Sequence, residues 1–215
     1  LVEMKLSIST VMTSLWAAAS IRSVRAFLPT SVPHSQRASG APLFLLDKMF
    51  GSTSAKSSEY PVYAEESVMS PKAHGTSEKP VQKSLRWNCD FETADRICNY
   101  NRHYAEFAGY WTQTDFLKYV KENWKEGDEP IKFYDSVTGK LLFQAPVGRS
   151  MDAFLKESVK HGWPSFRDEE TNWEYVRCLR NGEAVSVSGT HLGHNIPDAN
   201  GNRYCINLVS VAGQP

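Results

Sequence analysis

Apolar side chains recur every three or four positions between residues 97 and 124, which is the spacing of an α-helix that buries one face. The first set consists of Ile97, Tyr100, Tyr104, Phe107, Ala108 and Trp111, and the second of Phe116, Leu117, Val120 and Trp124. The pattern therefore predicts two helices near the start of the folded region.

A hairpin and a third helix are expected next. Residues 131–134 and 141–143 are mainly apolar, and the Thr138-Gly139 pair between them is typical of a turn. Ser150 is a residue type that caps the start of a helix, and His161-Gly162 can end one. The apolar side chains of this short helix are Met151, Phe154 and Leu155.

The last third of the chain has the pattern of strands. Residues 174–179, 184–187 and 204–211 are the expected strands, and Asn181-Gly182 is typical of a tight hairpin turn between the first two. The fold class that follows is mainly β: a small mixed or antiparallel β-sheet domain with an N-terminal helical extension.

A dense cluster of turn residues, 197–202, divides the segment that carries the candidate chemistry. A fold at its midpoint brings His194 opposite Cys205, and strand alternation puts Arg203, Cys205 and Asn207 on one face. A positive charge and a histidine beside a thiol lower its pKa, which would make Cys205 a nucleophile.

Two other interpretations of these residues are open on spacing alone. A lone cysteine in a strand is more often a small buried residue than a nucleophile. His191 and His194 could be structural, or could bind a metal together with Cys205, although a fourth ligand is not evident.

The N-terminal region is interpreted as an address. No acidic residue occurs from Met4 to Leu46, and Lys5 precedes an apolar stretch, which is typical of a signal peptide. We assign residues 1–26 to a signal peptide, 27–82 to a transit peptide and flexible linker, and 83–215 to the domain, with 83–128 as its helical extension. This arrangement resembles the two-part presequences of algae with secondary plastids. It predicts a plastid protein without a membrane segment in its mature form.

Composition narrows the classes of function. The chain has 24 basic and 24 acidic side chains, so no overall charge favours binding to nucleic acid. The four cysteines have neither the C-x-x-C spacing nor the density of a disulfide scaffold. Thiol chemistry or buried packing is the expected use of them.

Three strings resemble, in wording and order, the signature segments of the methionine-R-sulfoxide reductases (MsrB, Mss4-like fold). They are H-G-W-P-S-F at 161–166, H-L-G-H at 191–194 followed by Asp198, and R-Y-C-I-N at 203–207. The resemblance covers roughly residues 133–211. It implies that Cys205 attacks the sulfoxide with Arg203 as its charge partner. His191, His194, Asp198 and Asn207 would position the oxygen and deliver a proton, and Trp163 and Phe166 would bind the substrate.

Two departures from that family change the expectation. Many members hold zinc with two pairs of cysteines, and the matching positions here are Asp135, Thr138, Val185 and Ser188, so we predict no zinc. His161 replaces the usual resolving cysteine. Cys178 is the best remaining candidate for that role, and direct reduction by an external thiol is the alternative.

The resulting functional prediction is thiol-dependent reduction of methionine-R-sulfoxide through a Cys205 sulfenic acid, as repair of oxidative damage in a plastid. The expected partners are oxidised methionine in proteins or peptides and a thioredoxin-like or small-thiol reductant, without an organic cofactor. Two alternatives remain: a non-catalytic module of the same fold that senses redox state or binds oxidised methionine, and a structural plastid protein that uses only the fold.

Overall fold

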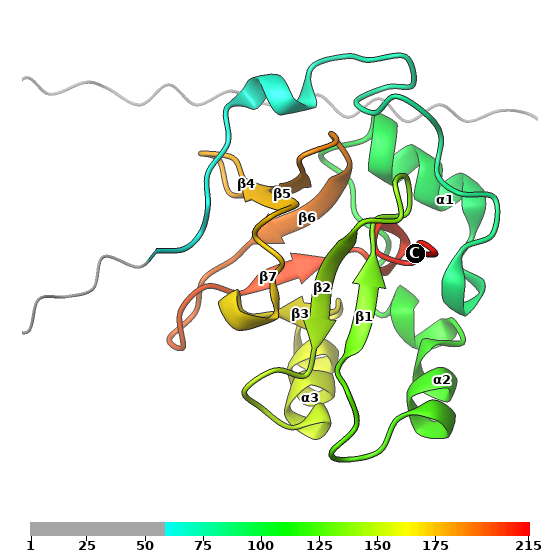
Figure 1. Ribbon diagram of the computed structural model, residues 1–215, viewed down its shortest axis with the longest axis vertical. Coiled ribbons are helices and arrows are strands. Elements are labelled where there is room, and N and C mark those ends of the chain that lie inside the picture. Colours follow the sequence, from blue (N-terminus) through cyan, green and yellow to red (C-terminus); the bar gives the residue numbers. More distant parts are fainter. Residues whose placement is uncertain (1–58) are drawn as a thin grey trace, which may run out of the picture. The chain divides into compact units, whose positions relative to one another are not determined.

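Two antiparallel sheets organise residues 59–215, the part of the chain that the computed structural model describes (Figure 1). The larger sheet has five strands in the order β3-β7-β6-β5-β4, and the smaller one pairs β1 with β2. The strands are β1 (Ile131–Tyr134), β2 (Leu141–Ala145), β3 (Ser165–Phe166), β4 (Val176–Cys178), β5 (Glu183–Ser186), β6 (His191–Asn195) and β7 (Tyr204–Ile206). The expected mainly β class with antiparallel strands is confirmed.

Helices are short and lie in the first part of the domain and after the β1–β2 hairpin. The α-helices are α1 (Phe91–Asp95), α2 (Phe116–Asn123) and α3 (Met151–His161), and a π-helix (Arg96–Tyr100) continues α1. The 3-10 helices are Glu66–Met69, Arg86–Asn88, Tyr110–Gln113, Asp168–Glu170 and Leu208–Ser210. No helix among the described residues is long and apolar enough to cross a membrane.

Local capping explains α3. The Ser150 hydroxyl accepts a hydrogen bond from the Ala153 amide at 3.2 Å, which supplies a partner for an otherwise free N–H group. Gly162 ends the helix with φ 87°, and its amide donates to the Ser158 carbonyl. Both expected ends of this helix are therefore confirmed, and they fix the position of Trp163 directly after the helix.

The first predicted helix is wrong beyond Tyr100. The α1 and π-helical turns end there, and the chain continues as an irregular loop in which Tyr104 and Phe107 are exposed. The apolar spacing of these two residues does not reflect a buried helix face. We name residues 102–109 the pocket loop.

Residues 59–82 are also not the expected flexible linker. Tyr63 forms a parallel bridge to Cys178, so this segment extends the sheet at the β4 edge. Met69 and Val81 are 3% and 2% exposed and anchor the segment in two apolar clusters. The sequence analysis missed Met69 and Val81 because most of the neighbouring side chains are polar. The predicted signal peptide and most of the predicted transit peptide lie outside the described residues.

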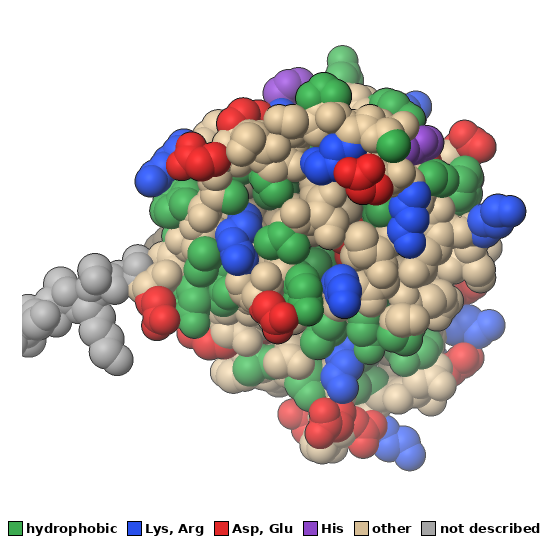
Figure 2. Space-filling model, turned by 45° about the horizontal axis from the view of Figure 1, so that its top comes forward, with side chains coloured by type: hydrophobic (Ala, Val, Ile, Leu, Met, Phe, Trp, Pro, Cys, Tyr) green, Lys and Arg blue, Asp and Glu red, His purple; other side chains and the backbone are tan. Residues whose placement is uncertain are grey.

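The main core lies between the two sheets and the helices. Phe166 stacks on Phe143 with 4.5 Å between ring centroids and meets Phe133 edge to face. The surface is mixed in charge: on the face that Figure 2 shows, basic and acidic side chains are interspersed.

Candidate active site

The β6–β7 hairpin brings the predicted nucleophile and a histidine together. His194 pairs with Cys205 in the antiparallel register, as the turn composition predicts. On the other side of β6, His194 pairs with Glu183 of β5. Directly opposed residues of an antiparallel sheet point to the same face. The row Glu183, His194 and Cys205 therefore presents a carboxylate, an imidazole and a thiol on one face.

A β-bulge adds the second histidine to this face. His191 and His194 are three residues apart, and strict alternation would send them to opposite faces. The register passes from Gly193 opposite Ala184 to His191 opposite Val185, which leaves Leu192 as the extra residue of a bulge. The two imidazole rings consequently lie 5.6 Å apart between centroids. The sequence analysis missed this bulge, although Gly193 within the strand is a signal of one.

These side chains line one pocket of about 190 Å³. Five predicted site residues contribute to it: Cys205, His191, His194, Asn207 and Trp163. Its remaining lining residues are His103, Tyr104, Ala105, Gly193 and Ile196. The first three belong to the pocket loop. The sequence analysis did not assign them to the site, because it expected a helix here and distant contacts determine where the loop lies.

Hydrogen bonds orient the polar groups of the pocket. His191 Nδ1 lies 2.7 Å from Glu183 Oε1, so Nε2 is the ring nitrogen left for a ligand. Glu183 also accepts from the Arg102 guanidinium, with 2.6 Å between Nη2 and Oε2. Neither Glu183 nor Arg102 was predicted. Asn207 donates through Nδ2 to the Leu192 carbonyl at 3.0 Å, which fixes its amide plane.

The expected low pKa of Cys205 is wrong. Burial is the dominant effect and raises the pKa of this thiol above its ordinary value of 9.0, while the Arg203 guanidinium acts in the opposite direction. The sequence reveals Arg203 two residues away but not the depth of the pocket. Burial, together with the nearby His191, lowers the pKa of His194 from 6.5, so His194 is neutral at neutral pH.

Four predicted site residues are not among those that line the pocket: Phe166, Asp198, Arg203 and Cys178. Phe166 is fully buried in the main core, because it alternates with Ser165 on β3 and faces the opposite side of the sheet from Cys205. Asp198 lies at the exposed tip of the β6–β7 hairpin, where its carboxylate pairs with Arg167 at 2.9 Å. It lies 3.6 Å from Arg203 Nε and so can affect Cys205 only through that guanidinium.

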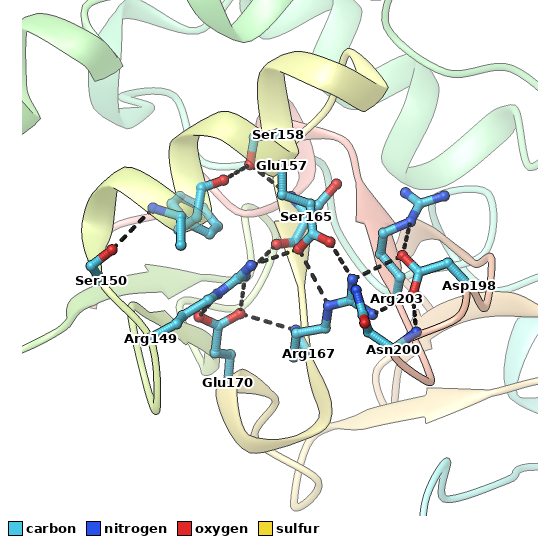
Figure 3. A network of polar contacts seen from close by, with 12 residues as sticks. Arg149, Ser150, Glu157, Ser158, Ser165, Arg167, Glu170, Asp198, Asn200 and Arg203 are labelled. Atoms are coloured by element: carbon cyan, nitrogen blue, oxygen red, sulfur yellow. Dashed lines mark hydrogen bonds and ion pairs between the residues drawn. The ribbon is translucent and has the colours of Figure 1, made fainter.

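Asp198 belongs to a charge network that joins α3 to the hairpin and continues to Arg203 (Figure 3). Arg149 binds Glu170 and Glu157, Glu157 also binds Arg167, and Arg167 binds Asp198. Oxygen atoms of Glu157 and Asp198 and a nitrogen atom of His161 come within 4.8 Å of one another. Because both carboxylates are already paired with Arg167, we assign no metal to this cluster.

Cys178 is too far from Cys205 to form a disulfide with it. The register aligns Cys178, Ala184, Gly193 and Ile206 in one row, on the face opposite Cys205. Three strand spacings amount to roughly 14 Å, which exceeds the Cα separation that a disulfide allows. Burial also raises the pKa of Cys178 to about 12. The prediction of Cys178 as a resolving residue therefore does not fit the fold.

At the positions that would correspond to a zinc site, hydrogen bonds of a buried carboxylate hold the turns together. The Asp135 carboxylate is fully buried and accepts from the Val137 amide at 2.8 Å and from the Thr190 hydroxyl at 3.0 Å. It thereby links the β1–β2 turn to the β5–β6 turn. Thr138, Val185 and Ser188 supply no thiolate, imidazole or carboxylate, so these four positions do not provide the ligands of a structural zinc site.

Comparison with models of known protein families gives no match, and neither does comparison with curated proteins. The resemblance to the methionine-R-sulfoxide reductases rests on the three sequence strings and stays a prediction.

Proposed function

We propose that this protein reduces methionine-R-sulfoxide to methionine, with Cys205 as the attacking thiol. The observation that carries the proposal is the single pocket that combines Cys205, His191, His194, Asn207 and Trp163. These residues come from three separate strings that resemble one reductase family. The MsrB type of the fold is part of the same proposal.

The pocket suits a sulfoxide because it offers different groups to its two ends. The Trp163 ring gives an apolar wall for the methyl group. The indole N–H donates a hydrogen bond to the Glu106 carbonyl at 3.1 Å, which fixes the ring. His191 Nε2, His194 and the Asn207 amide are polar groups for the sulfoxide oxygen. No lysine, arginine, aspartate or glutamate side chain lines the pocket among the described residues.

The chemical step balances without an external proton. Neutral His194 accepts the Cys205 proton, and the thiolate bonds to the sulfoxide sulfur as the histidine returns the proton to the sulfoxide oxygen. The O–H group of this adduct then moves to the Cys205 sulfur, and the bond between the two sulfur atoms breaks. Cleavage of the S–O bond of the substrate leaves methionine, reduced by two electrons. The oxygen and the proton end on Cys205 as a sulfenic acid, oxidised by two electrons.

Recycling uses an external thiol. A first thiol condenses with the sulfenic acid to give a mixed disulfide and water, and a second thiol releases Cys205 as a free thiol with formation of an external disulfide. The burial of Cys89, Cys98 and Cys178, whose pKa values burial raises, supports an external thiol over an internal one. A small thiol or a thioredoxin-like protein supplies the electrons, and repair in a plastid is the proposed setting.

Two observations favour a second candidate function. The raised pKa of Cys205 and the distance to Cys178 also suit a non-catalytic module that binds oxidised methionine or senses redox state. Such a module would bind the sulfoxide in the same pocket and would not turn it over.

The test is an assay of the 215-residue chain with each epimer of a methionine-sulfoxide peptide and dithiothreitol. We expect reduction of the R epimer only and its complete loss in Cys205→Ser, because oxygen cannot replace the sulfur that forms a sulfenic acid. Cys178→Ser is the matched control and should retain turnover. Turnover by Cys205→Ser would refute the proposal, and binding of the R epimer without any turnover would favour the second candidate.

A further inference from the structure

Glu106, in the pocket loop, is a buried carboxylate next to the candidate site. Its side chain is 3% exposed and accepts hydrogen bonds from the Leu208 amide at 2.8 Å and the Val209 amide at 3.1 Å. These amides begin the 3-10 helix that follows β7. Glu106 therefore holds the pocket loop against the turn directly after Cys205 and Asn207.

The backbone of the same residue contacts two side chains of the pocket. The Glu106 amide donates to Asn207 Oδ1 at 3.1 Å, and the Glu106 carbonyl accepts from Trp163 Nε1 at 3.1 Å. One residue thus fixes the amide and the indole that we assign to substrate binding. Neither contact depends on the Glu106 side chain directly, but both depend on where that side chain anchors the loop.

The pocket loop is attached at its two ends as well. Arg102 binds Glu183, the partner of His191, and the Gly109 amide donates to the Gly162 carbonyl at 2.8 Å. A side chain at Gly162 would place its Cβ 3.0 Å from that of Ala108, so the loop packs closely beside Trp163. Between these attachments, His103, Tyr104 and Ala105 line the pocket.

We propose that Glu106 is a positioning residue, which sets the Asn207 amide and the Trp163 indole at the places where they hold the sulfoxide. This inference rests on the proposed function for its substrate. It gives the helical extension a role in the site. Burial raises the pKa of Glu106 to about 7, so keeping a carboxylate here has a cost that an apolar residue would avoid. That cost is consistent with a role in the geometry of the site.

Glu106→Gln tests the proposal in the full chain. The amide keeps the shape of the side chain but can accept only through one oxygen, and it presents an NH₂ group to the second backbone amide. We expect KM for the R-sulfoxide peptide to rise about tenfold, while kcat changes less than about threefold, because the lost interaction acts on binding. Alkylation of Cys205 by iodoacetamide should be no slower, which separates pocket geometry from thiol reactivity.

Glu92→Gln, at an exposed position of α1, is the matched control and should behave as the wild type. If Glu106→Gln does not fold, Glu106→Asp keeps the charge, shortens the reach by one methylene and should raise KM in the same direction. An unchanged KM in the folded variant overturns the proposal.

A second readout needs no substrate. Hydrogen exchange in a peptide spanning residues 204–211 should be faster in Glu106→Gln than in the wild type, because one of the Leu208 and Val209 amides loses its acceptor. Unchanged exchange there overturns the role of Glu106 even if the wild type is active. A wild type that neither binds nor reduces the sulfoxide refutes the proposed function and, with it, the substrate role of Glu106, whereas faster exchange would still support the anchor.

Discussion

The reactivity of Cys205 depends on two opposed effects on one thiol. Burial raises its pKa, and the guanidinium of Arg203 lowers it. Arg203 is 5% exposed, and its Nε and Nη1 atoms have no hydrogen-bond partner among the described residues. Buried donors without acceptors are uncommon in folded proteins. A thiolate or a sulfenate oxygen on Cys205 would be an acceptor for these two Arg203 donors. Arg203 is therefore suited to stabilise the charged forms of Cys205.

Arg203→Met should raise the pKa of Cys205 further. The substitution keeps an apolar stem but removes the nearest positive charge, and we expect the pH profile of Cys205 alkylation by iodoacetamide to move upward by roughly one unit. Rate against pH, with mass spectrometry to assign the modified cysteine, is the measurement. Arg180→Met, at an exposed position in the β4–β5 turn, serves as control. A profile that does not move would mean that Arg203 only packs.

At the scale of elements, the sequence predicted the features that depend on neighbouring residues, such as turns and helix ends. The turn residues 197–202 fixed the opposition of His194 and Cys205, and Ser150 with Gly162 fixed both ends of α3. The bulge at Leu192 was missed although Gly193 is a signal of one, and the pocket loop was missed because distant contacts determine it. The strand expected to reach Val211 ends at Ile206 for the same reason, since the Glu106 carboxylate binds the next amides and favours a 3-10 helix.

The buried Asp135 carboxylate, which joins two turns, gives a prediction at this scale. Asp135→Asn should lower the free energy of unfolding by roughly 2–3 kcal/mol, because an NH₂ group would face donors that now find a carboxylate. Chemical denaturation followed by tryptophan fluorescence measures the change. Asp152→Asn, an exposed carboxylate on α3, is the control. An equal effect of the two substitutions would show that Asp135 does not hold the turns together.

The same residue gives a pH dependence with a defined sign. Burial raises the pKa of Asp135 from its ordinary value of 3.8. Between that value and the raised one, the Asp135 carboxyl of the folded protein keeps a proton that the unfolded chain has released. The Asp135 contribution to the free energy of unfolding should therefore fall as pH rises above that ordinary value. In Asp135→Asn this part of the pH dependence should disappear, and an unaltered dependence would argue against the raised pKa.

At the scale of the whole molecule, residues 59–82 close one side of the domain (Figure 1). They pair with β4 through the Ala64 amide and the Cys178 carbonyl at 2.9 Å, which covers an otherwise open sheet edge. Tyr60 stacks on Trp173 with 5.1 Å between ring centroids. Composition predicted a linker because most of these side chains are polar. A few apolar anchors and backbone hydrogen bonds are enough to hold such a segment, and neither leaves a periodic pattern in the sequence.

The last prediction compares two shortened chains, one starting at residue 59 and the other at residue 84. Removal of residues 59–83 uncovers the β4 edge and the apolar surfaces that Met69 and Val81 cover. Full burial of one such side chain contributes about 1.5–3 kcal/mol, so the two together contribute roughly 3–6 kcal/mol. For a domain of this size, a loss of that order should lower the thermal midpoint by about 10 °C or more.

Calorimetry of both shortened chains beside the 215-residue chain is the measurement. The chain that starts at 84 should unfold at a lower temperature than the chain that starts at 59, and should associate through its open edge. Equal midpoints would contradict a structural role of residues 59–83. These residues contact β4, and Glu66 reaches the pocket loop through its ion pair with Arg102 at 2.6 Å. Residual activity of the shorter chain at low temperature would show that the segment stabilises the domain without being needed to form the pocket.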